Sequence, residues 1–112
     1  MKEQRMYSPD KWVVLYYPEH EDYAILGGFY GGYLHGDSWR RSTSIQRVEE
    51  TDDGYMFYNK SGSVYKCHKN SYGFTGLSGA VHSQIADRVP ALTEDEAIKF
   101  IDILQKEQSD ED

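Results

Sequence analysis

The segments with strand-like composition all precede those with helical periodicity, and this order constrains the fold more than any other feature. Between residues 11 and 69 the chain is rich in β-branched and aromatic residues, and turn-forming residues interrupt it at intervals. The expected strands cover residues 11–18, 22–32, 38–50, 55–59 and 63–69. Strands followed by helices are typical of α+β folds. We therefore expect an antiparallel meander of about five strands, with two C-terminal helices packed on one face.

Apolar spacing predicts both helices. The first is expected over Ser78–Val89, before Pro90. For the second, Thr93 and Glu96 have the spacing of a capping box, in which each side chain bonds the other residue's backbone N–H. Beyond this box, apolar residues recur at i, i+3, i+4 and i+7: Ala97, Phe100, Ile101 and Leu104. Such a stripe predicts a helix that buries one face.

Two irregularities are expected in the strands. Trp39 and Ile45 share a parity along residues 38–50, but Val48 does not, so we predict a β-bulge near Gln46. Residues 60–62, with sequence Lys-Ser-Gly, are expected to connect two strands as a hairpin whose glycine takes a positive φ.

Length and charge limit the classes of function. A chain of 112 residues is expected to form a single domain over 1–112, with a frayed acidic tail at 107–112. The net charge is -7, and residues 93–112 supply -6 of it through eight acids and two lysines, which leaves -1 for the rest. A body this close to neutral lacks the basic stripe that nucleic-acid binding needs, so no direct nucleic-acid partner is expected.

The distribution of apolar residues and cysteine predicts a cytoplasmic protein. No apolar run approaches the roughly 20 residues that span a bilayer, so no membrane partner is expected. The charged N-terminal segment is not followed by the apolar stretch of a signal peptide. Cys67 is the single cysteine and cannot form an internal disulfide.

No cluster of side chains predicts catalysis or metal binding. Cys67, His68 and His82 lack the spacing of zinc ligands, and neighbouring strand residues point to opposite faces. Cys67 as a nucleophile would need a histidine base and a lowered pKa, whereas a lone buried cysteine usually serves as a small hydrophobe. We expect no catalytic residue, no metal and no cofactor, and the protein is not expected to be an enzyme.

The segment ILGGFYGGYLHGDSWRR, residues 25–41, is the candidate binding segment. Its G-G-x-x-G-G spacing matches neither a dinucleotide fingerprint nor a P-loop, and no helix is expected after it. One interpretation is a strand that coils or bulges where glycines remove side chains and another backbone approaches closely. The other is a shallow surface of aromatic and arginine side chains that binds planar bases and phosphate. The candidate binding residues are Tyr30, Tyr33, Asp37, Trp39, Arg40 and Arg41.

Asp37 has two possible roles. It is expected to accept a hydrogen bond from the backbone two residues on, which would fix the approach to Trp39. The competing role is a salt bridge to Arg40 or Arg41.

Residues 27–45, GGFYGGYLHGDSWRRSTSI, and residues 61–69, SGSVYKCHK, resemble segments of small uncharacterised proteins encoded by tailed bacteriophages. The resemblance covers about residues 23–85. It implies no activity and no catalytic residues. It does imply a context in which small proteins bind host factors, including components of antiviral defence.

Together these observations favour a non-catalytic protein-binding module, encoded by a phage, that inhibits or modulates a host protein, for instance as a counter-defence factor. The 10 tyrosines fit this hypothesis because tyrosine is enriched at recognition surfaces, although a thin sheet could also use large rings in its core. The acidic helix would steer the protein toward a basic partner, such as a nucleic-acid-binding enzyme, and sheet edges make a homodimer plausible. The alternatives are a small-molecule binder that sequesters a nucleotide signal and a structural phage component.

Overall fold

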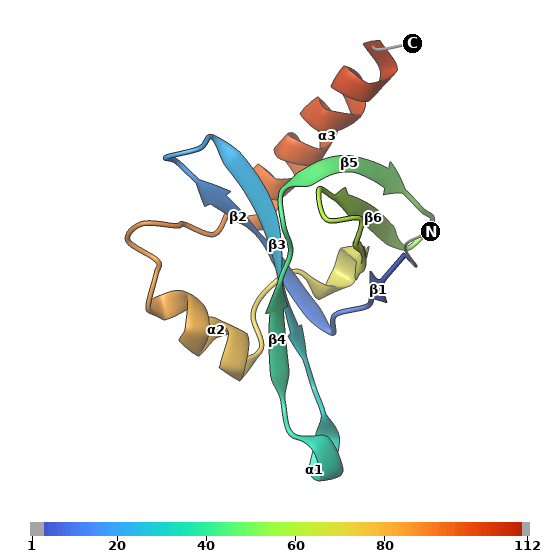
Figure 1. Ribbon diagram of the computed structural model, residues 1–112. Coiled ribbons are helices and arrows are strands. Elements are labelled where there is room, and N and C mark those ends of the chain that lie inside the picture. The colour runs from blue at the N-terminus through green and yellow to red at the C-terminus, as the bar shows by residue number, and fades with distance from the viewer. Residues whose placement is uncertain (1–3, 111–112) are drawn as a thin grey trace.

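Two open sheets and three helices make up the α+β fold in the computed structural model, which describes residues 4–110 (Figure 1). The small sheet has the strand order β2-β3-β4, and the large sheet has the order β1-β7-β6-β5. The strands are β1 (Met6–Tyr7), β2 (Lys11–Tyr17), β3 (Asp22–Phe29), β4 (Ser38–Arg41), β5 (Ile45–Glu50), β6 (Gly54–Asn59) and β7 (Val64–His68). The helices are α1 (Gly32–His35), α2 (Gly76–Ser83) and α3 (Glu94–Asp110), and a 3₁₀ turn covers Lys69–Ser71.

The expected third strand, 38–50, is in fact two strands in different sheets, so a single five-stranded meander is wrong. The chain crosses between the sheets at Ser42, a buried residue. Its backbone N–H donates to the carbonyl oxygen of Ile25 at 2.8 Å, and its Oγ accepts from the Ile25 N–H at 2.8 Å. These bonds end the pairing of β4 with β3, and the chain then joins the large sheet as β5. The predicted bulge is confirmed, because the register of β5 against β6 shifts between Ile45 and Arg47.

In the small sheet, β2 and the middle of β3 are buried on both faces, whereas all four residues of β4 are exposed. The burial of both faces explains the continuous apolar run of β2. On one face Trp12, Val14 and Ile25 belong to a core cluster with residues of the large sheet and of α3: Val48, Phe57, Tyr65, Cys67, Ala97 and Ile101. On the other face Val13, Leu15 and Leu26 pack with Val89 and Ala91.

The two long helices do not share one face of a sheet. Residues Val81 and Ile85, in and just after α2, border a groove together with Leu15 and Leu26 of the small sheet. Helix α3 instead packs on the opposite face, through the core cluster that contains Val14. The two helices therefore do not pack on one face as expected, because both faces of β2 are apolar and each needs a cover.

Helix α3 forms as its capping box predicts. The Thr93 N–H donates to Glu96 Oε1 at 2.8 Å, and the Glu96 N–H donates to Thr93 Oγ1 at 3.2 Å. Ala97 and Ile101 are buried, as the apolar stripe predicts. Residues 107–110, part of the expected frayed tail, are helical, whereas 111–112 lie outside the described residues.

Helix α2 begins and ends earlier than expected. Thr75 caps it, accepting from the Ser78 N–H at 3.0 Å while the Thr75 N–H donates to Ser78 Oγ at 2.9 Å. The helix ends at Ser83, and the segment up to Val89 continues as turns. The apolar spacing that predicted a longer helix continues into these turns through Ile85, whose side chain is half-buried.

Candidate functional site

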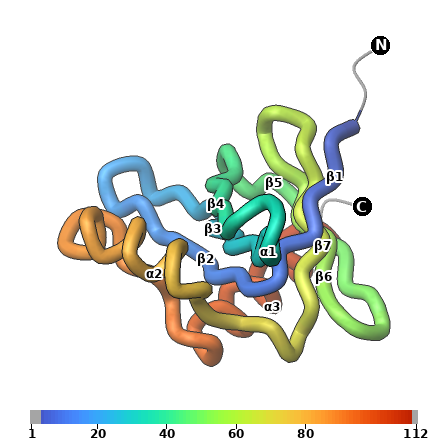
Figure 2. The backbone as a smooth tube through the Cα atoms, turned by 90° about the horizontal axis from the view of Figure 1, so that it is seen from below, coloured from blue at the N-terminus to red at the C-terminus, as the bar shows by residue number. Residues whose placement is uncertain are grey.

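Strands β3 and β4, with the connection between them that contains α1, form an arm (Figure 1). Residues 11–13 of β2 pair with β3 along the stem of this arm, and its tip, the connection around α1, projects from the end of the small sheet. Figure 2 shows this arm end-on, with α2 on one side and the large sheet on the other. Tyr33 and Leu34 at its tip are 102% and 82% exposed, and Tyr30 beside them is 55% exposed. The tip therefore presents large apolar side chains to solvent.

The backbone of the arm tip is fixed by hydrogen bonds. The Tyr30 N–H donates to Asp10 Oδ2 at 2.7 Å, and the Gly31 N–H donates to Asp37 Oδ1 at 3.4 Å. Gly32 and Gly36 both have a φ of 67°, a conformation that favours glycine. A Cβ at Gly31 would collide with the carbonyl oxygen of Gly36. The glycines at the tip thus permit a tight connection between β3 and β4.

The glycines in the stem of the arm allow close packing of side chains from other segments, not of the backbone that the structural interpretation expected. A Cβ on Gly28 would collide with the side chains of Thr75 and Ser78, the capping box of α2. A Cβ on Gly27 would lie 2.9 Å from Cβ of Pro9. The register of β3 against β2 is regular through both positions, so the two glycines do not form a bulge. Their missing side chains instead leave room for the residues that pack against the stem.

The six predicted binding residues do not form one site. Tyr30, Tyr33 and Asp37 lie at or near the tip, and the other three lie on β4. Trp39 is 46% exposed and borders the groove beside α2. Arg40 and Arg41 extend to opposite sides of the strand, because consecutive strand residues alternate.

The two arginines have different aromatic neighbours. The Arg40 guanidinium carbon lies 4.3 Å from the ring centroid of Tyr7, and the Arg41 guanidinium donates to the Tyr17 hydroxyl at 2.9 Å. Asp37 forms neither of the two interactions expected for it. It accepts from the Gly31 N–H across the connection, and in the described part of the chain it has no salt bridge to an arginine.

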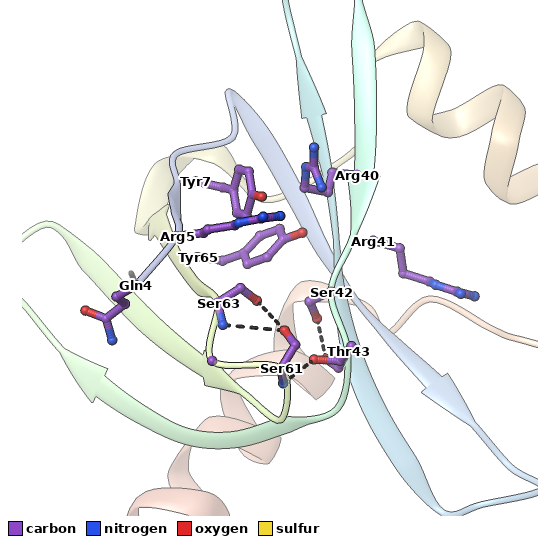
Figure 3. A pocket seen from close by; sticks show the side chains of 11 residues that line it. Gln4, Arg5, Tyr7, Arg40, Arg41, Ser42, Thr43, Ser61, Ser63 and Tyr65 are labelled. Carbon is purple, nitrogen blue, oxygen red and sulfur yellow. Dashed lines mark hydrogen bonds between the residues drawn. The ribbon is translucent and has the colours of Figure 1, made fainter. Parts of the chain in front are cut away.

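A cleft of about 810 Å³ opens between the arm stem and the large sheet (Figure 3). Four segments border it: the strand β1 with the residues before it, the end of β4 with the crossover, the turn before β7, and β7 itself. The lining residues are Gln4, Arg5, Tyr7, Arg40, Arg41, Ser42, Thr43, Ser61, Gly62, Ser63 and Tyr65.

The cleft is positively charged. Three of the five arginines of the chain border it, and none of the acidic residues within 4–110 does. Figure 3 shows Arg5 and Arg40 on the cleft side, whereas Arg41 points away. Tyr65 is buried at the floor, and this burial raises its pKa far above the ordinary tyrosine value, although the positive charge of Arg40 acts in the opposite direction. Tyr65 therefore stays protonated at any physiological pH.

Sequence reasoning missed Arg5, Tyr7, Ser61, Ser63 and Tyr65 as members of a site. Strand β1 has only two residues, and it pairs in parallel with β7, which lies more than fifty residues later. A strand so short leaves no periodic pattern in the sequence. The segment containing Ser61 and Tyr65 carries no sequence pattern that indicates binding chemistry.

The residues weighed for catalysis are engaged in structural roles. Cys67 is fully buried, and this burial raises the pKa of its thiol well above the usual value, which disfavours the thiolate that a nucleophile needs. His82 Nε2 lies 2.8 Å from the carbonyl oxygen of Val89, and its ring stacks on Phe74. Within residues 4–110, no group of three His, Cys, Asp or Glu side chains is placed to hold a metal ion.

Comparison with known proteins identifies no relative. No protein-family model matches the sequence. No curated protein matches it. No solved structure matches the fold. Among the helices of the described chain, none combines the length and the apolar character that crossing a bilayer requires.

Proposed function

We propose that this protein is a non-catalytic protein-binding module whose main contact surface is the arm of β3, α1 and β4. The observation that carries the proposal is the exposure of Tyr33 and Leu34 at the tip. Tyrosine is among the residues that dominate the energy of protein interfaces, because its large rigid side chain buries much area at small entropic cost.

The fixed backbone of the arm supports the same proposal. Binding orders side chains and loops at a free-energy cost, and a connection that is already ordered reduces that cost. The bonds from Tyr30 to Asp10 and from Gly31 to Asp37 supply this order. The partner would be a protein with an apolar pocket that accepts Tyr33 and Leu34, while Trp39 widens the contact along the stem.

The resemblance to phage proteins supports a more specific proposal. The partner would be a protein of a bacterial host, and binding would inhibit or modulate that protein, for example in antiviral defence. The acidic residues of α3 would raise the rate of association with a basic partner, such as a nucleic-acid-binding enzyme, because opposite charges steer the encounter.

The test is affinity capture from bacterial lysate followed by titration of the purified partner. The double variant Tyr33→Ala/Leu34→Ala removes the tip side chains, and Ile103→Ala is the matched control, since Ile103 is an apolar residue 58% exposed on α3. We expect the double variant to weaken the Kd by at least about 30-fold, which corresponds to about 2 kcal/mol for the loss of interface anchors. The control should bind as the wild type does.

Two results would contradict the proposal. One is a partner whose Kd is unchanged by the double variant. The other is self-association in analytical ultracentrifugation that disappears in the double variant, because the arm would then join two copies of this chain instead of a different protein.

A further inference from the structure

We propose that the cleft between the arm stem and the large sheet binds a phosphate-bearing small molecule of about nucleotide size. This site is separate from the tip of the arm. One interpretation of the sequence places phosphate binding on the glycine-rich segment 25–41. We assign phosphate binding to the cleft instead, and Arg40 belongs to both.

The first argument is charge. The protein has a net charge of -7, yet among the described residues the cleft is faced by Arg5 and Arg40 and bordered by no acidic side chain. Within the described residues, neither Arg5 nor Arg40 has a carboxylate within salt-bridge distance. Guanidinium groups without a protein counter-ion are suited to bind phosphate, which they contact through two parallel hydrogen bonds.

The second argument is the arrangement of the two guanidinium groups. The carbonyl oxygen of Arg5 accepts from the Val64 N–H at 2.8 Å, which ties the backbone of Arg5 to β7. Arg40 extends from β4 on the opposite side of the cleft, and its guanidinium lies over the face of the Tyr7 ring. Figure 3 shows the guanidinium of Arg5 and the hydroxyl ends of Tyr7 and Tyr65 pointing toward β4, where Arg40 stands. An anion bound there would meet donors from both sheets.

The third argument is the hydroxyl groups at the other end of the cleft. Thr43 Oγ1 accepts from the Ser61 N–H at 3.0 Å. Ser63 Oγ accepts from Asn59 Nδ2 at 3.2 Å and from Ser61 Oγ at 3.2 Å. Because these oxygens act as acceptors within the protein, the hydroxyl hydrogens of Thr43 and Ser63 are available as donors. A site of donors without carboxylates selects an anion over a cation or a neutral molecule.

The size of the cleft sets the class of ligand. A volume of about 810 Å³ lies within the range of roughly 300–1,000 Å³ usual for small-molecule sites, and inorganic phosphate alone would leave most of it unfilled. One end supplies arginines and tyrosines, and the other supplies hydroxyls. The arrangement fits a molecule with a phosphate or diphosphate between the arginines and a polar remainder over the residue 61–63 turn.

Isothermal titration calorimetry with pyrophosphate, ADP and adenosine tests this site. We expect pyrophosphate and ADP to bind and adenosine not to bind. Arg40→Gln and Arg5→Gln should each weaken ADP binding by about tenfold or more, since each removes a charge-assisted pair. Arg88→Gln is the matched control: it makes the same change of charge at an exposed arginine outside the cleft, and it should leave the affinity unchanged.

Several results would overturn this proposal. They are the absence of heat with all three compounds at millimolar concentration, equal binding of adenosine and ADP, and an equal loss of affinity in Arg88→Gln. A short single-stranded oligonucleotide that binds more tightly than ADP would also overturn it, because the site would then serve nucleic acid. The variant Tyr33→Ala/Leu34→Ala should bind ADP normally, so the outcome here is independent of the protein-binding proposal.

Discussion

Tyr72 joins two parts of the fold that are distant in sequence, and its hydroxyl is the most informative single group to remove. The hydroxyl accepts from the Val14 N–H at 3.1 Å and donates to the Leu92 carbonyl oxygen at 2.7 Å. Val14 and Leu92 are also bonded to each other directly, because the Leu92 N–H donates to the Val14 carbonyl oxygen at 2.8 Å. The hydroxyl thus bridges the edge strand β2 and the segment that leads into α3.

The variant Tyr72→Phe keeps the ring and leaves two backbone groups without partners. Val14 is fully buried and Leu92 is half-buried, so water cannot replace both bonds. Each unsatisfied buried group costs about 1–3 kcal/mol, and discounting the accessible carbonyl gives a total near 2 kcal/mol. For a domain of this size, that loss lowers the Tm by roughly 10 °C.

The assay is urea denaturation of the wild type, Tyr72→Phe and the control Tyr58→Phe. The Tyr58 hydroxyl donates to an exposed carboxylate, Glu49 Oε2 at 3.0 Å, so its loss should change the free energy of unfolding by less than about 0.5 kcal/mol. A Tyr72→Phe variant as stable as the control would refute the reasoning, because the bridge between β2 and residue 92 would then contribute nothing.

Three further predictions concern the side chain of Gln108, the glycine at position 31 and the ionisation of Tyr72. Gln108→Ala should lower the free energy of unfolding, measured in urea, by about 1–2 kcal/mol. The Gln108 amide accepts from the Val48 N–H at 2.7 Å and donates to the Val48 carbonyl oxygen at 2.9 Å, and the variant loses both bonds. The control Gln105→Ala loses one exposed bond and should change the free energy of unfolding little. Gly31→Ala should change the amide NMR signals of the arm tip and weaken partner binding while the Tm stays near that of the wild type, because its Cβ would collide only within the tip. Burial raises the pKa of Tyr72 from 10.0 to about 12, so the folded state favours its neutral form. That contribution to stability is full below pH 10 and is lost as the pH rises toward 12, so the difference in unfolding free energy between the wild type and Tyr72→Phe should shrink over this interval.

Local patterns predicted the elements that depend on neighbouring residues. The capping box at Thr93 and Glu96 fixes the start of α3 through contacts three residues apart. The bulge before Arg47 follows from a break in alternation within one strand. Both were predictable because the interactions that form them lie within a few residues of the chain.

The division into two sheets could not be predicted in the same way. Residues 38–50 have strand-like composition throughout, and the crossover is set by bonds between Ser42 and Ile25 that only the folded chain brings together. The cleft has the same origin, since the parallel pairing of β1 with β7 brings Arg5 to the cleft that Arg40 borders. The expected close approach of another backbone occurs at Gly31, whereas the side chains of Thr75 and Ser78 that pack on Gly28 are brought there by tertiary packing alone.

Site-specific photo-crosslinking shows whether the tip of the arm contacts a partner protein. A benzoylphenylalanine placed at Tyr33 is compared with one placed at Ile103, both exposed positions on different parts of the surface. We expect a crosslinked partner from position 33 and none from position 103. A partner that crosslinks from position 103 while position 33 yields no adduct would contradict this expectation.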